Sequence, residues 1–373
     1  MAHLNPADFV LTAARTHGFV LAGIGPATPS PHADHVKQWL ADGKHGEMHY
    51  LANHLDVRLN PDKLLPGAQS VIAVAEPYHA TNDPPANPPT PATPEAARGR
   101  LARYAHGDDY HKVLKKRLHQ LADALATEYP AEQFRTTVDT APALERELAT
   151  AAGLGWTAKN TLLIHPKHGS YFLLGLIVTT LELPSSEARD YPVPTVPATD
   201  HCANCTRCID ACPTDAIAPE GYSLNATRCI SYLTLEHRSP IDPALHASMG
   251  DWLGGCDICQ DVCPYNTIAS RQTSPLPIHD RYTPRPELAH GLTLIDVLNW
   301  TADDRANTFR GSSLKRIKLD MIRRNALIAS GNALAQHHDS ALRAAVQACV
   351  NDTSELVRIT AQQVMKQLEK SKG

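Results

Sequence analysis

Eight of the nine cysteines lie in one segment, between Cys202 and Cys263. A chain of 373 residues can bury a sizeable core without disulfides. Its first residues show no basic segment followed by an apolar one, so we expect no secretory signal peptide. In a reducing compartment, a dense group of cysteines indicates metal ligation rather than disulfide bonding.

The spacing of these cysteines is typical of iron–sulfur clusters. The first run reads C-x2-C-x2-C-x3-C-P and comprises Cys202, Cys205, Cys208, Cys212 and Pro213. This is the bacterial ferredoxin run, in which the fourth cysteine binds the other cluster. The second run reads C-x2-C-x3-C-P and comprises Cys256, Cys259, Cys263 and Pro264. It lacks one leading cysteine, for which Cys229 is the only unassigned candidate nearby.

The crossover rule assigns these thiolates to two 4Fe-4S clusters. Cluster one takes Cys202, Cys205, Cys208 and Cys263, and cluster two takes Cys212, Cys229, Cys256 and Cys259. Two structural zinc sites are the alternative, because zinc also takes four-cysteine sets with C-x2-C pairs. Zinc needs neither the third cysteine at the same step nor the Cys-Pro ending. The ninth cysteine, Cys349, lies on the apolar face of an expected helix and is interpreted as a core residue.

Alternating helix and strand signals over residues 1–183 predict an α/β domain. Helices are expected at residues 7–17, ended by Gly18, and at 110–128; strands are expected at 19–24, 71–75, 135–138 and 172–183. Pro142 fits the first turn of a helix that follows Asp139. Six prolines between residues 84 and 94 predict an exposed loop.

The rest of the chain predicts two further domains. Prolines after Leu183 indicate a linker to the cysteine-rich module. Beyond that module, apolar residues at helical spacing predict short paired helices and a small helical-repeat domain. We therefore expect an α+β multidomain protein divided at 1–190, 191–275 and 276–373. No apolar run is long enough to span a bilayer, so we expect a cytoplasmic protein.

Three other features carry candidate functional residues. Asp139 stands where a strand runs into a helix, and it is either a catalytic acid or a helix N-cap. Near an apolar cofactor its carboxyl would have a raised pKa and could donate a proton. The turn from Gly155 to Thr161 either cradles a ligand or is simply a loop. Seven basic residues and one acid lie between Arg305 and Arg324, which suits either a phosphate backbone or a solvated helix face.

The chain resembles the epoxyqueuosine reductase family over nearly its whole length. The matching stretches are residues 46–51 with Arg58, 66–72, 103–105, 109–112, 138–142, 144–146, 153–156, 159–161, 229–234, 255–264, 309–312 and 323–326. The resemblance implies a cobalamin-binding α/β domain, a ferredoxin-like two-cluster module and a C-terminal HEAT-like domain. It implies reduction of epoxyqueuosine to queuosine at the wobble position of tRNA, the last step of queuosine biosynthesis, with electrons passed through both clusters to cobalamin.

The resemblance also implies roles for particular residues and partners. Asp139 corresponds to the proton donor of the family. The implied cobalamin contacts are Arg58, Tyr104, Asp139, Lys159, Asn160, Ser231 and Asp257. The implied tRNA contacts are Arg310, Lys315, Arg316, Lys318, Arg323 and Arg324. Reduced ferredoxin or flavodoxin would be the electron donor, and the enzyme would be a monomer.

Three alternative functions remain at this point. The first is another corrinoid iron–sulfur enzyme, such as a reductive dehalogenase. The second is an electron-transfer adaptor without catalytic activity, although residues 1–183 would then need another purpose. The third is a flavin in place of the corrinoid.

Overall fold

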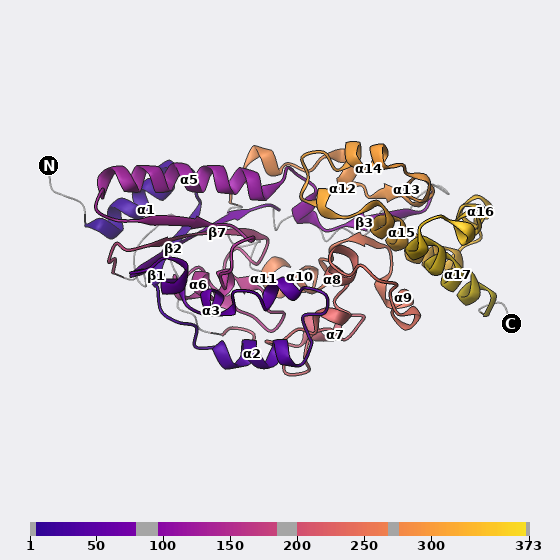
Figure 1. The fold of residues 1–373 in the computed structure, drawn as a ribbon, viewed down its shortest axis with the longest axis horizontal. Helices are drawn as coiled ribbons and strands as arrows, with labels where there is room; N and C mark the ends of the chain where they lie inside the picture. Colours follow the sequence, from indigo (N-terminus) through magenta and orange to yellow (C-terminus); the bar gives the residue numbers. More distant parts are fainter. Residues whose placement is uncertain (1–4, 80–95, 185–199, 268–275, 371–373) are drawn as a thin grey trace.

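The structure is a computed structural model, and it describes residues 5–79, 96–184, 200–267 and 276–370. The N-terminal sheet lies at one end of an elongated molecule and the C-terminal helices at the other (Figure 1). The proline-rich stretch 84–94 and most of the expected linker fall outside the described residues, so those two predictions are not tested. None of the helices in the described ranges is long and apolar enough to cross a membrane.

A four-stranded sheet forms the centre of the N-terminal half. In spatial order its strands are β1 (Leu21–Pro26), β2 (Ser70–Pro77), β7 (Phe172–Thr179) and β4 (Phe134–Thr137). All three neighbouring pairs are antiparallel. The expected mixture of helices and strands is confirmed, but the α/β class is wrong for this half, because alternating units of that class build a mainly parallel sheet. Alternation along the chain does not by itself fix the direction of a strand.

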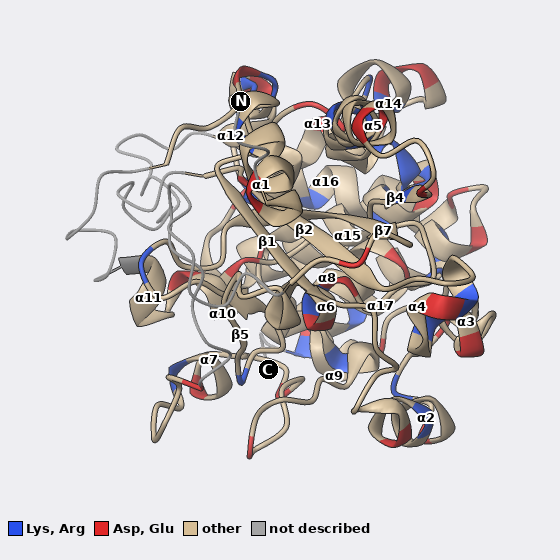
Figure 2. Cartoon of the chain, turned by 90° about the vertical axis from the view of Figure 1, so that its left-hand side faces the viewer, with Lys and Arg blue, Asp and Glu red and all other residues tan. Residues whose placement is uncertain are grey.

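Helices cover both faces of this sheet (Figure 2). Helices α1 (Pro6–Thr16) and α5 (Tyr110–Glu128) lie on one face, and α6 (Glu145–Ala151) lies on the other. Side chains alternate along β2, so Ile72 packs with α1 and α5 while Val71 packs on the side of α6. Because α6 begins at Glu145, the prediction that Pro142 lies in its first turn is wrong.

The cysteine-rich segment and its surroundings consist of short elements. They are α2 (Ala33–Ala41), α3 (Leu55–Leu59), α4 (Pro61–Leu64), β5 (Trp156–Thr157), β6 (Leu163–Ile164), α7 (Arg207–Asp210), α8 (Ile230–Leu235), α9 (Pro243–Met249), α10 (Ile258–Asp261) and α11 (Pro264–Thr267). Their brevity suits a segment in which the loops, rather than the helices, present the cysteines.

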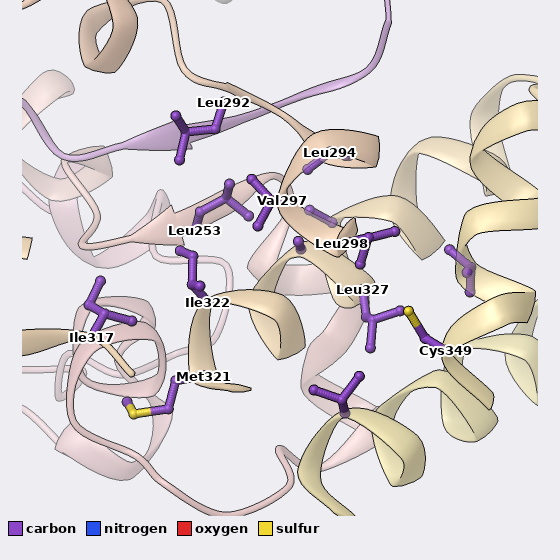
Figure 3. Close-up of a cluster of buried hydrophobic side chains, with 14 of the residues drawn as sticks. Leu253, Leu292, Leu294, Val297, Leu298, Ile317, Met321, Ile322, Leu327 and Cys349 are labelled. Carbon is purple, nitrogen blue, oxygen red and sulfur yellow. The ribbon is translucent and has the colours of Figure 1, made fainter. Parts of the chain in front are cut away.

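The last part of the described chain is helical, as expected. Its helices are α12 (Pro286–Ala289), α13 (Leu294–Asn299), α14 (Ala302–Thr308), α15 (Leu319–Gln336), α16 (Ser340–Ala348) and α17 (Glu355–Lys370). Figure 3 shows part of their common core, in which Leu327 faces Cys349. Cys349 is only 4% exposed, so its interpretation as a core residue is confirmed.

A second, small sheet joins segments that lie far apart in the sequence. Strand β3 (Arg98–Leu101) pairs with β8 (Trp252–Gly254) on one side and with β9 (Leu292–Thr293) on the other. Each strand comes from a different one of the three expected domains. The domain boundaries and the HEAT-like character of the helices stay predictions.

Candidate functional site

All eight clustered cysteines are free thiols. We call the set expected for cluster one the first cysteine group (Cys202, Cys205, Cys208 and Cys263) and the set expected for cluster two the second cysteine group (Cys212, Cys229, Cys256 and Cys259). Burial raises the pKa of Cys263 to about 11, and the nearby thiols of Cys202 and Cys208 add to that rise. Burial raises the pKa of Cys259, and the charges of Cys229, Cys208 and Cys212 add to that rise. Cys208 belongs to the set expected for cluster one and the other two belong to the set for cluster two, so the two sets adjoin each other, and the ligand assignment stays a prediction.

Backbone N–H groups point at several of these thiols. The N–H of Ala216 donates to the Sγ of Cys212 at 3.3 Å. Burial raises the pKa of Cys229, whereas the N–H groups of Tyr232 and Ser231, at the start of α8, oppose that rise. Such donors stabilise thiolates, which are the form in which cysteine binds metals. This donor chemistry fits iron–sulfur clusters.

In the described ranges, no three Cys, His, Asp or Glu side chains lie close enough together to hold a single metal ion. A cubane spreads its four thiolates over four different irons, so its ligands stand further apart than those of one ion.

The turn after Gly155 contacts both cysteine runs. The Nζ of Lys159 donates to the carbonyl oxygens of Ala203 at 2.6 Å and Cys205 at 3.2 Å. The Nδ2 of Asn160 donates to the carbonyl oxygen of Cys259 at 3.3 Å. The turn therefore holds the loops that carry the cysteines, and the predicted cobalamin contacts of Lys159 and Asn160 stay untested.

A cavity of about 450 Å³ opens beside this turn. Its walls include all four thiols expected for cluster one, namely Cys202, Cys205, Cys208 and Cys263. The same walls include the basic side chains of Lys159 and Arg207. The first cysteine group thus lies next to a cavity.

Asp139 follows β4 in an unusual backbone conformation. Its φ is +54°, a left-handed value that is rare for residues other than glycine. The Oε1 of Glu145 accepts a hydrogen bond from the backbone N–H of Asp139 at 2.6 Å and so supports this conformation. Leu144 is the residue that precedes α6, so the interpretation of Asp139 as a helix N-cap is wrong. Its side chain is 49% exposed.

A chain of charged groups leads to the Asp139 carboxylate. The Nε2 of His111 lies 2.8 Å from Oδ2 of Asp139, and its Nδ1 lies 2.8 Å from Oδ1 of Asp109. Asp109 is buried, caps α5, and pairs with the Nζ of Lys315 at 2.8 Å. Because both ring nitrogens face carboxylate oxygens, both carry protons in this arrangement. Burial opposes that charge, but the hydrogen bonds to Asp139 and Asp109 outweigh it and raise the pKa of His111.

The two carboxyl groups of this site have opposite pKa shifts. The hydrogen bond from His111 holds the pKa of Asp139 below its usual value, although burial opposes this. A cation faces the carboxylate and lowers its pKa; the raised pKa expected beside an apolar cofactor stays a prediction. Burial, followed by the charge of Asp139, raises the pKa of Glu145 to about 7. Groups whose surroundings push their pKa values apart are typical of sites that move protons.

The surroundings of Asp139 include unpaired and exposed groups. The Nε of Arg58, on α3, is buried and lacks a hydrogen-bond partner within the described residues. The ring of Tyr50, whose charge interactions reach Arg58 and Asp139, is 52% exposed. Burial raises the pKa of Tyr104 to about 12, and Asp139 is among the charges that act on it. Arg58 therefore holds an unused donor, and Tyr50 and Asp139 are each about half exposed.

Arg146 links Asp139 to the second cysteine group. Burial lowers the pKa of its guanidinium, whereas the charges of Asp139, Cys259 and Cys229 raise it. Arg146 therefore lies within electrostatic range of Asp139 and of two thiols of the second cysteine group.

Two residues that were predicted to contact a ligand, Asp257 for cobalamin and Arg324 for tRNA, are buried and bind partners inside the protein. Asp257 is 1% exposed; its Oδ2 accepts from the backbone N–H of Arg103 at 2.8 Å and pairs with the same guanidinium at 3.3 Å. Arg324 is 0% exposed, and its guanidinium donates to backbone carbonyls, including that of Leu233 at 2.6 Å. The prediction that Arg324 contacts tRNA is therefore wrong, and a direct cobalamin contact of Asp257 finds no support. A buried charge needs such internal partners.

The remaining basic residues divide by exposure. The side chains of Lys315 and Arg316 are 51% and 43% exposed, and Arg310 and Lys318 are also exposed. Arg323 is only 16% exposed and pairs with Asp352 at 2.6 Å, and its tRNA contact stays a prediction.

Sequence reasoning missed His111, Glu145, Arg146 and Trp156 as functional candidates. One signal for His111 was present in the sequence. It lies in the first turn of the helix expected at residues 110–128, two positions after Asp109, a residue type that caps helices. Nothing in the sequence shows that it faces Asp139, which lies 28 positions away.

Two family models match the chain. The model described as "Epoxyqueuosine reductase QueG, DUF1730" matches residues 58–140, and the "4Fe-4S double cluster binding domain" matches residues 201–266. The epoxyqueuosine reductase of Alicycliphilus denitrificans is 39% identical over 92% of this chain and 93% of its own length. That of Xanthomonas campestris pv. campestris is 37% identical over 96% of both.

Solved structures of the same kind have a similar fold. The epoxyqueuosine reductase of Streptococcus thermophilus is 26% identical, with a TM-score of 0.80 over 97% of this chain and 90% of that one. A crystal structure of an epoxyqueuosine reductase with an epoxyqueuosine-modified tRNA-Tyr stem loop is also 26% identical, with a TM-score of 0.76 over 97% and 98%.

Proposed function

The chain belongs to the epoxyqueuosine reductase family, and we propose that it reduces epoxyqueuosine to queuosine at the wobble position of tRNA. Converting the epoxide to an alkene takes two electrons and two protons and releases water. The observation that carries the proposal is the arrangement of the site: two cysteine groups supply a route for electrons, and Arg146 lies within electrostatic range of both the second group and Asp139, the proposed proton donor.

Electrons enter at cluster one in this proposal. The thiols assigned to cluster one line a cavity, so a reduced ferredoxin or flavodoxin can approach that cluster. We place cluster two between cluster one and Asp139, because the charge of Cys208 acts on Cys259 and the charges of Cys259 and Asp139 both act on Arg146. The order is therefore donor, cluster one, cluster two and reaction site.

Cobalamin is the cofactor that family membership implies for this site. The buried, unpaired Nε of Arg58 offers a donor, and the exposed ring of Tyr50 offers an apolar face, so the residues present fit a large ring with polar edges. Arg58 and Tyr104 would hold it beside Asp139. When bound, the corrinoid supplies a metal-centred reductant, and the protein supplies binding, orientation and the proton.

Asp139 donates the proton to the epoxide oxygen, and His111 supplies that proton to Asp139. At rest, the proton lies on the Nε2 of His111 and the Asp139 carboxylate accepts a hydrogen bond from it. As charge develops on the epoxide oxygen, the proton moves from His111 Nε2 to the Asp139 carboxylate, and the carboxylic acid formed in this way donates it to the epoxide oxygen. This relay explains how a carboxylate with a lowered pKa can act as an acid.

Replacing His111 with glutamine tests the relay. The pKa of His111 is raised above 6.5, so its proton is present below the raised pKa and is lost as pH rises through it. We therefore expect wild-type kcat to fall in that alkaline range, and the variant to lose this fall. At neutral pH the variant should lose activity by about 100- to 10,000-fold. A kcat–pH profile checks this, and an unchanged profile and rate in His111→Gln would contradict the relay.

The exposed part of the basic stretch is the proposed tRNA contact. Arg316 lies near enough to Asp139 to help lower its pKa, and it pairs with Glu236 at 2.9 Å. Lys315 and Lys318 lie beside it in the sequence and are exposed. A phosphate backbone bound here would bring the modified base close to the proton donor.

Neutralising Lys318 should weaken tRNA binding in a salt-dependent way. Each phosphate contact contributes about 0.7 to 0.9 to the slope of log K against log salt, so Lys318→Gln should lower that slope by roughly this amount. Lys37→Gln is the matched control, because Lys37 lies on α2, at the bottom of Figure 1. Binding titrations at several salt concentrations measure both, and an equal effect of the two variants would contradict the assignment.

Several finer features belong to the same proposal. The chain acts as a monomer in the cytoplasm, divided at 1–190, 191–275 and 276–373, with HEAT-like helices in the last part.

The experiment that tests the function is anaerobic reaction of the reconstituted protein with epoxyqueuosine-containing tRNA, followed by nucleoside mass spectrometry. Queuosine should form only with reduced clusters and added cobalamin. Unchanged epoxyqueuosine under those conditions would contradict the function.

A further inference from the structure

The indole of Trp156 is buried between the residue before Cys202 and a residue that follows Cys263. It is 1% exposed. Its ring meets that of His201, which precedes Cys202, edge-on at 4.8 Å, and that of Tyr265, which follows the Cys263-Pro264 pair, at 4.9 Å. Trp156 therefore packs against the protein on both sides of the proposed cluster one.

Within the described residues, the buried Nε1 of Trp156 lacks a hydrogen-bond partner. Buried tryptophan N–H groups usually find one, because leaving a desolvated donor unpaired is costly. The indole shares one buried cluster with Cys263, and the side chain of Cys202 packs against the same cluster.

The backbone holds Trp156 in this position. It lies in β5, which pairs with β6 so that Trp156 stands opposite Ile164. Gly155, with φ of +147°, precedes it, and an added Cβ there would collide with the carbonyl oxygen of Ile164. The close approach of the two strands thus requires glycine, and it fixes the place of the indole.

We propose that Trp156 donates its indole N–H to the Cys202 sulfur of cluster one and thereby raises the reduction potential of that cluster. A hydrogen bond to a cluster sulfur stabilises the reduced, more negative state over the oxidised one. One electron is added to the cluster, and no bond is made or broken. The consequence is functional, because the potential of the entry cluster decides how readily the external donor can reduce it. This inference rests on the proposed ligands of cluster one.

The test replaces Trp156 with phenylalanine in the full, reconstituted chain. This change keeps an aromatic ring but removes the N–H. Iron and sulfide are measured first, which separates a failure of the ligand assignment from a failure of this inference. Potentiometric titration followed by EPR then resolves the two cluster waves.

One wave should move to lower potential while the other stays in place. A hydrogen bond to a charged group changes an equilibrium constant by about tenfold. We therefore expect the equilibrium constant for reduction of cluster one to change by about tenfold, which corresponds to about 59 mV for one electron. Trp300→Phe is the matched control; its ring packs against Phe309 in the C-terminal core. Two unmoved waves, two waves that move together, or an equal effect of the control would overturn the proposal.

A second measurement does not depend on the stability of the Trp156→Phe variant. Wild-type protein labelled with ¹⁵N in its indole nitrogens should show a ¹⁵N coupling to reduced cluster one by pulsed EPR. The coupling should survive Trp252→Phe, which removes the other buried indole N–H without a partner in the described part of the chain. A missing coupling, or one that disappears with Trp252, would overturn the proposal.

Discussion

Replacing Asp139 with asparagine will lower kcat by about 100- to 10,000-fold, the range in which general acids contribute. Asparagine has almost the same shape, and its carbonyl oxygen can still accept the hydrogen bond from His111 Nε2, which spans 2.8 Å in the wild type. It cannot pass a proton to the epoxide oxygen. The loss should therefore appear in turnover and not in binding of tRNA or cofactors.

The measurement is single-turnover formation of queuosine, with cluster and corrinoid spectra recorded on the same sample. Asp34→Asn on α2 is the control, because the Asp34 side chain is 98% exposed and pairs only with Lys37 among the contacts the structure shows for it. Its turnover should equal that of the wild type. Wild-type turnover in Asp139→Asn would show that another group supplies the proton.

Replacing Cys212 with serine will remove cluster two and abolish turnover, although Cys212 stands in the first cysteine run. The crossed assignment places it with Cys229 and Cys259, and the Cys229 thiol lies near it in the structure. The variant should retain about half of the iron, because one of two equal clusters is lost. Its remaining EPR signal should match that of Cys259→Ser and differ from that of Cys205→Ser.

Two outcomes separate the crossed arrangement from an uncrossed one. If each cluster used only its own run, Cys212→Ser would resemble Cys205→Ser instead. Cys349→Ser serves as the control, because Cys349 is buried among the C-terminal helices and should leave all of the iron in place. A full iron content in Cys212→Ser would contradict the ligand set.

The cluster module could be predicted because its signal is local. Seven of the eight ligands lie in two short runs whose fixed spacing is that of ferredoxin cluster ligands. The central strands were equally accessible: β2 was expected at residues 71–75 and spans Ser70–Pro77, because a short apolar run suits a strand buried on both faces.

The other features depend on contacts between distant segments. Alternating helices and strands left the direction of β1 and β7 open, and both turned out antiparallel to β2. Arg324 lies in a basic stretch, but helix α15 buries it against the carbonyl of Leu233, 91 positions away. A charge pattern shows how many cations a segment carries and not which of them face the solvent.

The same limit applies to the reaction site. The sequence marks Asp139 as a candidate acid, and it suggests a raised pKa if an apolar cofactor is the main neighbour. The structure places His111 beside the carboxylate, which lowers the pKa of Asp139. Local patterns identify the residue, but the sign of its pKa shift depends on a partner from another helix.

The central claim is that two interlocked iron–sulfur clusters feed the site around Asp139. Metal and acid-labile sulfide analysis of protein prepared without oxygen tests it most directly. We predict four irons and four sulfides for each of two clusters per chain. Zinc bound to the same thiols, with neither iron nor sulfide, would contradict the account.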